Sequence, residues 1–276
     1  MNRSTTLNTI EHYGSSPSKE AASLCSGVAV LDVHHLTVAS FNSSTNEFQE
    51  YFVFDVPENT SSLKELMNKL QLKKLYVAVQ NNQFTVVPTG VITPENNTEY
   101  LNFILGEKRN QKESSMVINN LTANLLYRID QSVFKDLTKN GITVLHPAGS
   151  ALAYHSVFND DKAHHAVFLH IFDEAFHIYF FKNGLYHSNS FKITSDADIA
   201  YYTLYSMEQL EISVEDTPVH YTVQTSKQLN QLDSLKNYLP KLAPIELDTS
   251  FELNKDLQET LPNGVGITLL STLLCE

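Results

Sequence analysis

The first part of the chain alternates between polar stretches and apolar or alternating runs, a pattern that predicts strands. Such runs cover residues 24–31, 36–41 and 48–56. Leucines then recur at helical spacing over 63–70, after a serine that can cap a helix, and a continuous apolar run at 75–79 predicts a buried strand. This region therefore predicts the element order β-β-β-α-β.

The same order recurs in the second half, after a polar stretch at 159–162. The predicted elements are strands at 166–172, 175–181 and 185–193, a helix after Ser195, and a strand at 219–223. Asn183-Gly184 is typical of a type I′ turn and joins the second of these strands to the third. Two copies of one β-β-β-α-β unit indicate a duplicated fold.

Further elements are expected between and after the two units. They are a strand at 84–87, a helix after Pro94, a charged loop from Gly106 to Ser115, a strand at 125–129, a helix capped by Asp130 that stops at Gly141, a strand at 142–146, a helix at about 149–157, and a helix at about 227–238. The apolar run at 265–274 fits either a helix or a strand.

The domain organisation follows from these elements. The first twenty or so residues are rich in Ser, Thr and Asn without periodicity, which predicts a flexible tail. We therefore expect a tail at 1–22, a first subdomain at 23–160 with an insertion around 83–130, and a second subdomain at 161–276.

The repeated units resemble the ribonuclease-H-like halves of the actin, Hsp70 and sugar-kinase superfamily. A narrower resemblance is carried by Phe84-Thr85-Val86-Val87-Pro88, the stretch from Pro94 to Leu101, Leu126-Tyr127-Arg128-Ile129, Val144-Leu145-His146, and Val167 to Ile171 with the hairpin ending Lys182-Asn183-Gly184. Together these segments resemble an uncharacterised bacterial family, the domain of unknown function 3822, with an actin-like ATPase fold. The resemblance extends from about Leu24 to the C-terminus. It implies an α/β fold of mixed sheets flanked by helices, without an assigned activity.

An actin-like ATPase holds phosphates between two facing hairpin turns. Each turn needs an acidic residue for the magnesium shell and a glycine where backbone N–H groups approach the phosphates. The first turn here places Asp32 at the acidic position, but His34 stands where glycine is expected, and its side chain would crowd a phosphate. The second turn offers Asp173 and also lacks glycine. The resemblance thus implies Asp32 and Asp173 as cofactor-binding residues, if a Mg-ATP site survives.

Glycine is scarce in the whole chain, with nine residues where average usage predicts about twenty. Gly141 and Gly184 are explained by a helix end and a hairpin turn. Gly264 and Gly266 form a lone Gly-x-Gly, which is more often turn chemistry than a phosphate loop, and no glycine pair lies near 223–226, the nucleoside-binding segment of the second half. We therefore expect no ATP hydrolysis, no catalytic residue and no cofactor.

Charge and cysteine content restrict the partners and the compartment. The formal net charge of −12 disfavours binding to nucleic acid or to an anionic membrane surface. Two cysteines, Cys25 and Cys275, are too few for a disulfide framework and fit a reducing cytoplasm. The polar start of the chain lacks the apolar core of a secretory signal, and no apolar stretch is long enough for membrane insertion.

Histidine is abundant, with eleven residues. The candidate metal ligands are His164, His165, His170, Asp173, His177 and His187. Strand alternation puts His164 and His170 on one face and His165 on the other, so the three or four ligands that a metal needs do not converge. We therefore interpret them as histidines on exposed strand faces and expect no metal.

Three functional hypotheses remain. The first is a non-catalytic actin-like protein that acts through binding to another protein or through self-association. The second is a divergent nucleotide-binding ATPase or kinase that holds magnesium with Asp32 and Asp173. The third is a metal-binding protein that uses the histidine group.

Overall fold

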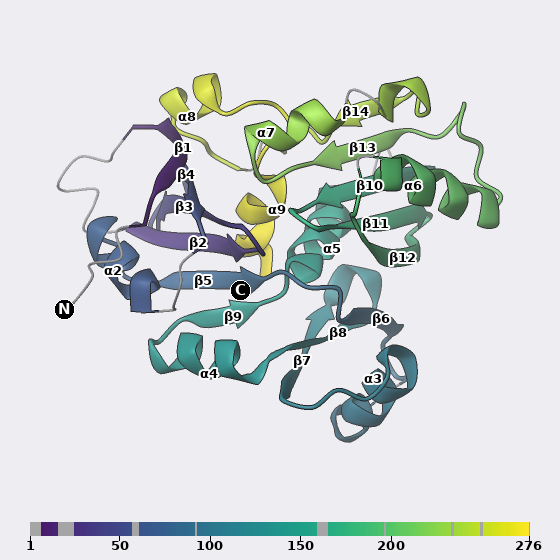
Figure 1. Cartoon of the computed structure of the whole chain (residues 1–276), viewed down its shortest axis with the longest axis horizontal. Coiled ribbons are helices and arrows are strands. Elements are labelled where there is room, and N and C mark those ends of the chain that lie inside the picture. Colours follow the sequence, from purple (N-terminus) through teal and green to yellow (C-terminus); the bar gives the residue numbers. More distant parts are fainter. Residues whose placement is uncertain are drawn as a thin grey trace.

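The computed structural model describes residues 7–15, 25–56, 61–91, 93–158, 165–195, 197–232, 235–248 and 251–275. Within these residues the strands form three sheets, of six, five and three strands. The two larger sheets belong to two lobes, and the small sheet belongs to an insertion in the first lobe (Figure 1). This arrangement confirms the predicted α/β fold of mixed sheets flanked by helices.

The six-stranded sheet has the order β1-β4-β3-β2-β5-β9. Its strands are β1 (Thr9–Gly14), β2 (Cys25–Leu31), β3 (His35–Asn42), β4 (Phe48–Asp55), β5 (Leu75–Val79) and β9 (Thr143–Leu145). Ala29 of β2 packs in the core under helices α2 (Ser61–Lys69) and α4 (Gln131–Lys139). Its neighbours Val28 and Val30 belong to the core shared with the second lobe. Because β2 is buried on both faces, its sequence is a continuous apolar run.

The five-stranded sheet has the order β12-β11-β10-β13-β14. Its strands are β10 (His165–Ile171), β11 (Ala175–Lys182), β12 (Leu185–Lys192), β13 (Val219–Thr222) and β14 (Leu242–Pro244). β10 pairs antiparallel with β11 and parallel with β13, just as β2 pairs antiparallel with β3 and parallel with β5. This matching order confirms the duplication. Helix α5 (Pro147–Phe158) leads from the first sheet toward the second, and α6 (Ala197–Gln209) follows β12.

The insertion has its own three-stranded sheet, in the order β6-β8-β7, and a helix. The elements are β6 (Phe84–Pro88), α3 (Asn97–Leu105), β7 (Gln111–Ile118) and β8 (Ala123–Asp130). Arg128 of β8 is fully buried and donates hydrogen bonds to Asn102 Oδ1 (2.6 Å), to the Gly106 carbonyl (2.7 Å) and to Glu113 Oε1 (3.2 Å). One guanidinium group therefore ties α3 and β7 to β8.

The prediction of a charged loop at 106–115 is wrong for residues 111–115, which belong to a strand. β7 begins at Gln111 and pairs with β8 along its whole length, from Gln111 opposite Asp130 to Ile118 opposite Ala123. Strand pairing with an apolar neighbour outweighs the weak strand propensity of this polar sequence.

The predicted N-terminal tail is also wrong for residues 9–14. These residues form β1, which pairs antiparallel with β4 at the edge of the first sheet. The His12 ring stacks on Phe52 with centroids 4.3 Å apart, and His12 Nε2 lies 3.1 Å from Glu50 Oε1. A polar segment without helical or strand periodicity is therefore held by an existing sheet edge, which its own sequence does not reveal.

Two expectations near the C-terminus are refined. The predicted helix at 227–238 is divided into α7 (Ser226–Leu229) and short 3₁₀ turns, one of them at Leu235–Asn237. Leu232 and Leu235, which belong to two of these turns, are both buried in the core. The apolar run at 265–274 is helical, with α9 (Ile267–Leu270) followed by a 3₁₀ helix.

The last segment of the chain packs against the first lobe. The Phe48 N–H donates to the Glu252 carbonyl, the Asn254 N–H donates to the Phe48 carbonyl, and α8 (Lys255–Thr260) lies beside β1 and β4. The predicted boundary between residues 160 and 161 lies outside the described residues. The C-terminal helices cross back to the strands of the first lobe. None of the described helices has the length and hydrophobicity needed to cross a membrane.

Gly266 allows this crossing segment to approach the first lobe. Its backbone has φ = +81°, and a Cβ atom there would lie 2.6 Å from the Tyr51 ring, which is fully buried. The lone Gly-x-Gly therefore has a structural role. Gly266 allows close packing against Tyr51, and the Gly264 carbonyl accepts hydrogen bonds from the Val223 N–H and from the Thr222 hydroxyl.

We expect Gly266→Ala to lower the free energy of unfolding by about 2 to 4 kcal/mol, because it combines a left-handed backbone with overpacking against a buried ring. Urea denaturation measures the change. Gly90→Ala is the matched control, since Gly90 also has a positive φ (+90°) but open space around it, and should cost about 1 kcal/mol. Equal losses in the two variants would contradict the packing role of Gly266.

Candidate functional site

Two hairpin turns from the two lobes meet at the point where an actin-like ATPase would hold phosphates. The β2–β3 turn contains Asp32, Val33 and His34, and the β10–β11 turn contains Asp173 and Glu174. Each turn follows a buried central strand, so both turns project from the ends of rigid elements. The structure therefore brings Asp32 and Asp173 together, although 141 residues separate them.

The carboxylate of Asp173 lies in the concave backbone of the opposite turn. Its Oδ2 accepts hydrogen bonds from the His34 N–H (2.9 Å) and the His35 N–H (3.0 Å), and its Oδ1 lies 2.5 Å from His35 Nδ1. Its side chain is only 3% exposed. Successive backbone N–H groups in a turn form an anion-binding concavity, and here the anion is a carboxylate of the protein itself.

Asp32 makes the reciprocal contact. Its Oδ2 accepts a hydrogen bond from the Asp173 N–H (2.7 Å), and its Oδ1 accepts one from the Val33 N–H (2.8 Å). Asp32 is buried, with 8% of its surface exposed. We call the group formed by Asp32, His34, His35 and Asp173 the carboxylate clasp. In it, the first turn binds the Asp173 carboxylate of the second lobe, and the Asp32 carboxylate of the first lobe binds the Asp173 N–H.

Burial and proximity shift the titration of the clasp. Burial and the neighbouring Asp173 raise the pKa of Asp32 to about 7, although two N–H groups donate to its carboxylate. The hydrogen bond with Asp173 raises the pKa of His35. Burial alone would raise the pKa of Asp173, but the hydrogen bonds from His35 and from the His34 N–H outweigh it, and that pKa is lowered. The clasp is thus an Asp173–His35 ion pair beside a carboxyl group that holds its proton unusually well.

The two acidic residues are not equivalent in the duplicated fold. The Asp32 N–H donates to the His35 carbonyl, and the Phe172 N–H donates to the Ala175 carbonyl, so the two turns superimpose with Phe172 at the place of Asp32. Asp173 therefore stands one position later than Asp32 within its turn. Phe172 is 1% exposed and packs against His177, with ring centroids 4.8 Å apart.

In this arrangement the residues do not fit a magnesium-bound phosphate. The N–H groups that would hold it already bind Asp173, and an apolar ring occupies the second acidic position. The expectation that the His34 side chain would crowd a phosphate is wrong in detail. The His34 ring points out of the clasp, where Nε2 lies 3.2 Å from Glu174 Oε1, and its side chain is 59% exposed.

The segment at 223–226, expected near a nucleoside, is also engaged by the first lobe. The Tyr51 hydroxyl donates to the Gln224 carbonyl (2.6 Å), and the Thr37 hydroxyl donates to Gln224 Oε1 (3.4 Å). Burial raises the pKa of Tyr51, so its hydroxyl keeps its proton and remains a donor. These contacts hold β3 and β4 to the end of β13.

Four buried histidines form the largest feature that sequence reasoning missed. His146, His155, His170 and His177 are each at most 1% exposed, so the interpretation of His170 and His177 as exposed strand residues is wrong. Both lie in inner strands of the sheet and are flanked by apolar residues, and this flanking sequence could have indicated that they are buried. Within the described residues no group of three or more possible ligands could hold a metal, and His164 lies outside them.

The buried histidines link elements of both lobes. His155 Nε2 of α5 lies 2.8 Å from His170 Nε2 of β10, and His170 Nδ1 lies 2.7 Å from the Thr268 hydroxyl of α9. Two arrangements of neutral rings satisfy these contacts. In the first, His155 Nε2–H donates to His170 and His170 Nδ1–H donates to Thr268; in the second, His170 Nε2–H donates to His155 and the Thr268 hydroxyl donates to His170 Nδ1. His155 Nδ1 has no hydrogen-bond partner in either arrangement, and the first is favoured because it leaves a lone pair rather than an N–H group without a partner.

The second pair lies beside the clasp turns. His177 Nε2 of β11 is 3.2 Å from Gln80 Nε2, and His146 Nε2 is 3.1 Å from the Asn81 carbonyl. The two imidazole rings stack with centroids 5.9 Å apart. Burial lowers the pKa of both rings, that of His146 to about 3, so they are neutral in the folded protein.

Comparison with known proteins agrees with the architecture. A family model described as "Protein of unknown function (DUF3822)" matches residues 28–242. No curated protein matches the chain. A solved structure from Bacteroides thetaiotaomicron VPI-5482, described as a protein with actin-like ATPase fold and unknown function, is similar with a TM-score of 0.75 and 17% identity, covering 95% of this chain and 100% of that one.

A second similar structure is described as a PilM-PilN type IV pilus biogenesis complex. Its TM-score is 0.65 at 13% identity, and the match covers 91% of this chain and 98% of that one. Likeness at these identities shows the fold, which is the actin-like ATPase fold.

Proposed function

This chain belongs to the DUF3822 family of proteins of unknown function, and from that premise we propose that it is a non-catalytic protein of actin-like fold that acts by binding another protein. Self-association is the second form of the same proposal. The observation that supports the non-catalytic function is the carboxylate clasp. The position at which the fold would bind phosphate is filled by Asp173, and direct hydrogen bonds of 2.7 to 3.0 Å between the turns leave no space for a phosphate group.

The energetics of the clasp support a closed cleft. To admit a phosphate, the protein would have to break the His35–Asp173 ion pair and the hydrogen bonds from the two backbone N–H groups, and it would then place the phosphate beside Asp32. Breaking a buried, hydrogen-bonded charge pair costs about 3 to 5 kcal/mol, which weakens any nucleotide affinity by a factor of about 10² to 4 × 10³.

Protein binding is supported by the fold comparison. PilM, which shares the fold, is described in a complex with PilN, so this fold can serve in a protein assembly. A cytoplasmic location belongs to the proposal and is supported by the low cysteine content, two residues in the chain, which fits a reducing compartment.

The divergent ATPase or kinase is the alternative, because Asp32 and Asp173 do lie together at the phosphate position. In that case the clasp would be a closed state that Mg-ATP opens, with the two carboxylates available to magnesium. Phe172 at the second acidic position argues against it.

Calorimetric titration with Mg-ATP separates the two functions. We expect no heat of binding at millimolar nucleotide. Micromolar binding that disappears in both Asp32→Asn and Asp173→Asn would establish the alternative and refute the non-catalytic proposal. Glu174→Gln is the control on the same turn, because this exposed carboxylate points out of the clasp.

A further inference from the structure

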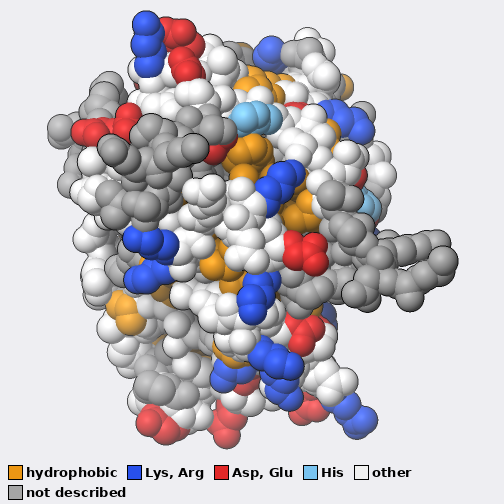
Figure 2. Space-filling model, turned by 90° about the vertical axis from the view of Figure 1, so that its left-hand side faces the viewer, with side chains coloured by type: hydrophobic (Ala, Val, Ile, Leu, Met, Phe, Trp, Pro, Cys, Tyr) orange, Lys and Arg blue, Asp and Glu red, His pale blue; other side chains and the backbone are white. Residues whose placement is uncertain are grey.

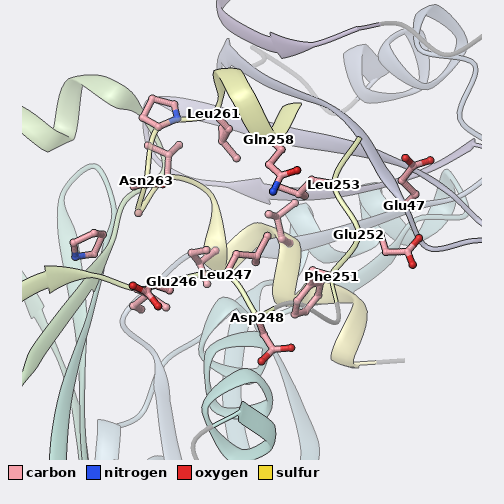
Figure 3. A pocket seen from close by; sticks show the side chains of 17 residues that line it. Glu47, Glu246, Leu247, Asp248, Phe251, Glu252, Leu253, Gln258, Leu261 and Asn263 are labelled. Carbon is pink, nitrogen blue, oxygen red and sulfur yellow. The ribbon is translucent and has the colours of Figure 1, made fainter. Parts of the chain in front are cut away.

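A pocket of about 740 Å³ lies away from the clasp, at the C-terminal crossing. Its walls come from the segment after β14, from α8 and the turn that follows it, from α9, and from the β3–β4 turn (Figure 3). The volume is within the range of about 300 to 1,000 Å³ that is typical of ligand sites. The clasp turns contribute no residue to it.

Apolar side chains line the buried part of the pocket, although polar groups make up more of its accessible surface than apolar groups do. Ile245, Val265 and Leu270 are buried in its floor, and Leu247 and Leu253 are half-buried in its walls. Figure 3 shows Leu247 and Leu253 toward the middle of the pocket. An occupant with apolar groups would therefore gain the hydrophobic contribution of burying them here.

The periphery of the pocket is acidic. Glu47, Glu246, Asp248 and Glu252 line it, and Figure 3 shows their carboxylates around the outside, on different sides. Glu246 and Glu252 are exposed. Among the described lining residues there is no Lys, Arg or His.

We propose that this pocket binds a short segment of another protein in which apolar side chains stand next to Lys or Arg. The apolar floor would contact the apolar side chains of this segment, and the carboxylates around the floor would attract its Lys or Arg side chains. A small amine carries one charge and meets few of these carboxylates, whereas a peptide segment can place several cations, separated by apolar groups, against carboxylates on several sides. Nucleic acids and acidic peptides are repelled.

This inference deepens the protein-binding function and rests on it. The chain's own basic surface suggests the main competing occupant, a second copy. Lys64, Lys69, Lys73 and Lys74 are exposed in and after α2. Figure 2 shows Lys and Arg side chains distributed down the side of the molecule that faces left in Figure 1, where α2 lies.

The test uses the full chain and a fluorescent hexapeptide, acetyl-Leu-Lys-Phe-Arg-Leu-Lys-amide with a C-terminal dye, in an anisotropy titration at about 50 mM salt. We expect saturable binding. A peptide with Glu in place of Lys and Arg, and one with Ser in place of the apolar residues, should not bind. The double variant Glu246→Lys with Glu252→Lys should weaken binding at least about tenfold.

The matched control is Glu65→Lys with Glu208→Lys, which makes the same change of net charge at exposed sites on α2 and α6. It should leave affinity within about twofold. Absence of binding, or equal weakening by both double variants, overturns the proposal. So does displacement of the peptide by phenethylamine at equal concentration, which would indicate a small-amine site.

Sedimentation of the unliganded protein completes the test. A dimer that dissociates only in the Glu246→Lys, Glu252→Lys variant would assign the pocket to a second copy and overturn the peptide proposal. Mg-ATP titration of the same sample keeps the two proposals distinct, because failure of the peptide alone leaves the non-catalytic function in place, whereas nucleotide binding refutes that function.

Discussion

Lowering the pH from 7 to about 4.5 is expected to unfold the protein cooperatively, because His146, His155, His170 and His177 are buried and neutral. Burial lowers the pKa of His146 and His170 to about 3 and lowers those of His155 and His177 well below the usual value. The unfolded chain binds a proton at each ring below about pH 6.5, whereas the folded protein does not. Stability from these groups is therefore present above pH 6.5 and is lost as the pH falls.

The expected loss is comparable with the whole stability of a domain. Each neutral histidine costs about 1.4 kcal/mol per pH unit, so four cost about 11 kcal/mol at about pH 4.5. Asp32 acts in the opposite direction, since its pKa is raised to about 7 and its stabilising effect grows as the pH falls from 7 toward 4. Asp32 therefore offsets about 3 kcal/mol of the loss from the histidines. The net loss of about 8 kcal/mol is comparable with the 5 to 15 kcal/mol by which a typical protein is stable.

Circular dichroism and urea denaturation at several pH values measure this effect. We expect the free energy of unfolding to fall increasingly steeply below pH 6.5, and His177→Gln to reduce the slope by about 1.4 kcal/mol per pH unit, which is one proton. His165→Gln on β10 is the control, because this ring is exposed and stays in water. A stability that is flat between pH 7 and pH 5 would contradict neutral buried histidines.

The duplicated fold could be predicted because its elements are local patterns. Strands β2, β5, β10 and β13 are apolar runs bounded by turns, and their order repeats. β1 and β7 could not be predicted in this way. Both are polar, and they are strands because an existing strand, β4 or β8, offers its edge.

The candidate site was predictable in part for the same reason. Asp32 and Asp173 lie in turns that the duplication identifies, and the sequence indicates that these turns lack glycine. Their mutual hydrogen bonds depend on how closely the lobes approach, and that distance is set by packing at the interface, including the contact of Gly266 with Tyr51. The shift by one position that puts Phe172 opposite Asp32 is visible only in the hydrogen bonds of the two turns.

Asp173→Ala is expected to lower the free energy of unfolding by about 3 to 5 kcal/mol at pH 7. The substitution leaves the His34 and His35 N–H groups and the His35 ring without their acceptor, and removal of one partner from a buried, hydrogen-bonded pair costs this much. Urea denaturation gives the total. Hydrogen exchange at the His34 and His35 amides gives the local effect, which we expect to be loss of protection.

The pH dependence of the clasp adds a second readout. The raised pKa values of His35 and Asp32 mean that the folded protein binds these protons more tightly than the unfolded chain. The contribution of His35 is therefore complete below about pH 6.5 and is lost as the pH rises through its raised pKa. The contribution of Asp32 is complete only near pH 4 and declines until about pH 7. We expect the stability difference between the wild-type protein and Asp173→Ala to become smaller between pH 6.5 and pH 8, because the variant lacks the carboxylate that raises the pKa of His35.

Glu174→Ala is the control for both readouts. Glu174 lies in the same turn, is about 42% exposed and pairs with the exposed His34 ring, so its removal should cost less than about 1 kcal/mol and leave the amides protected. If Asp173→Ala behaved like Glu174→Ala, the lobes would be held together mainly by their other contacts, such as those around Tyr51 and Gly266. The phosphate position would then be only lightly covered, and the argument for a closed, non-catalytic cleft would lose its main support.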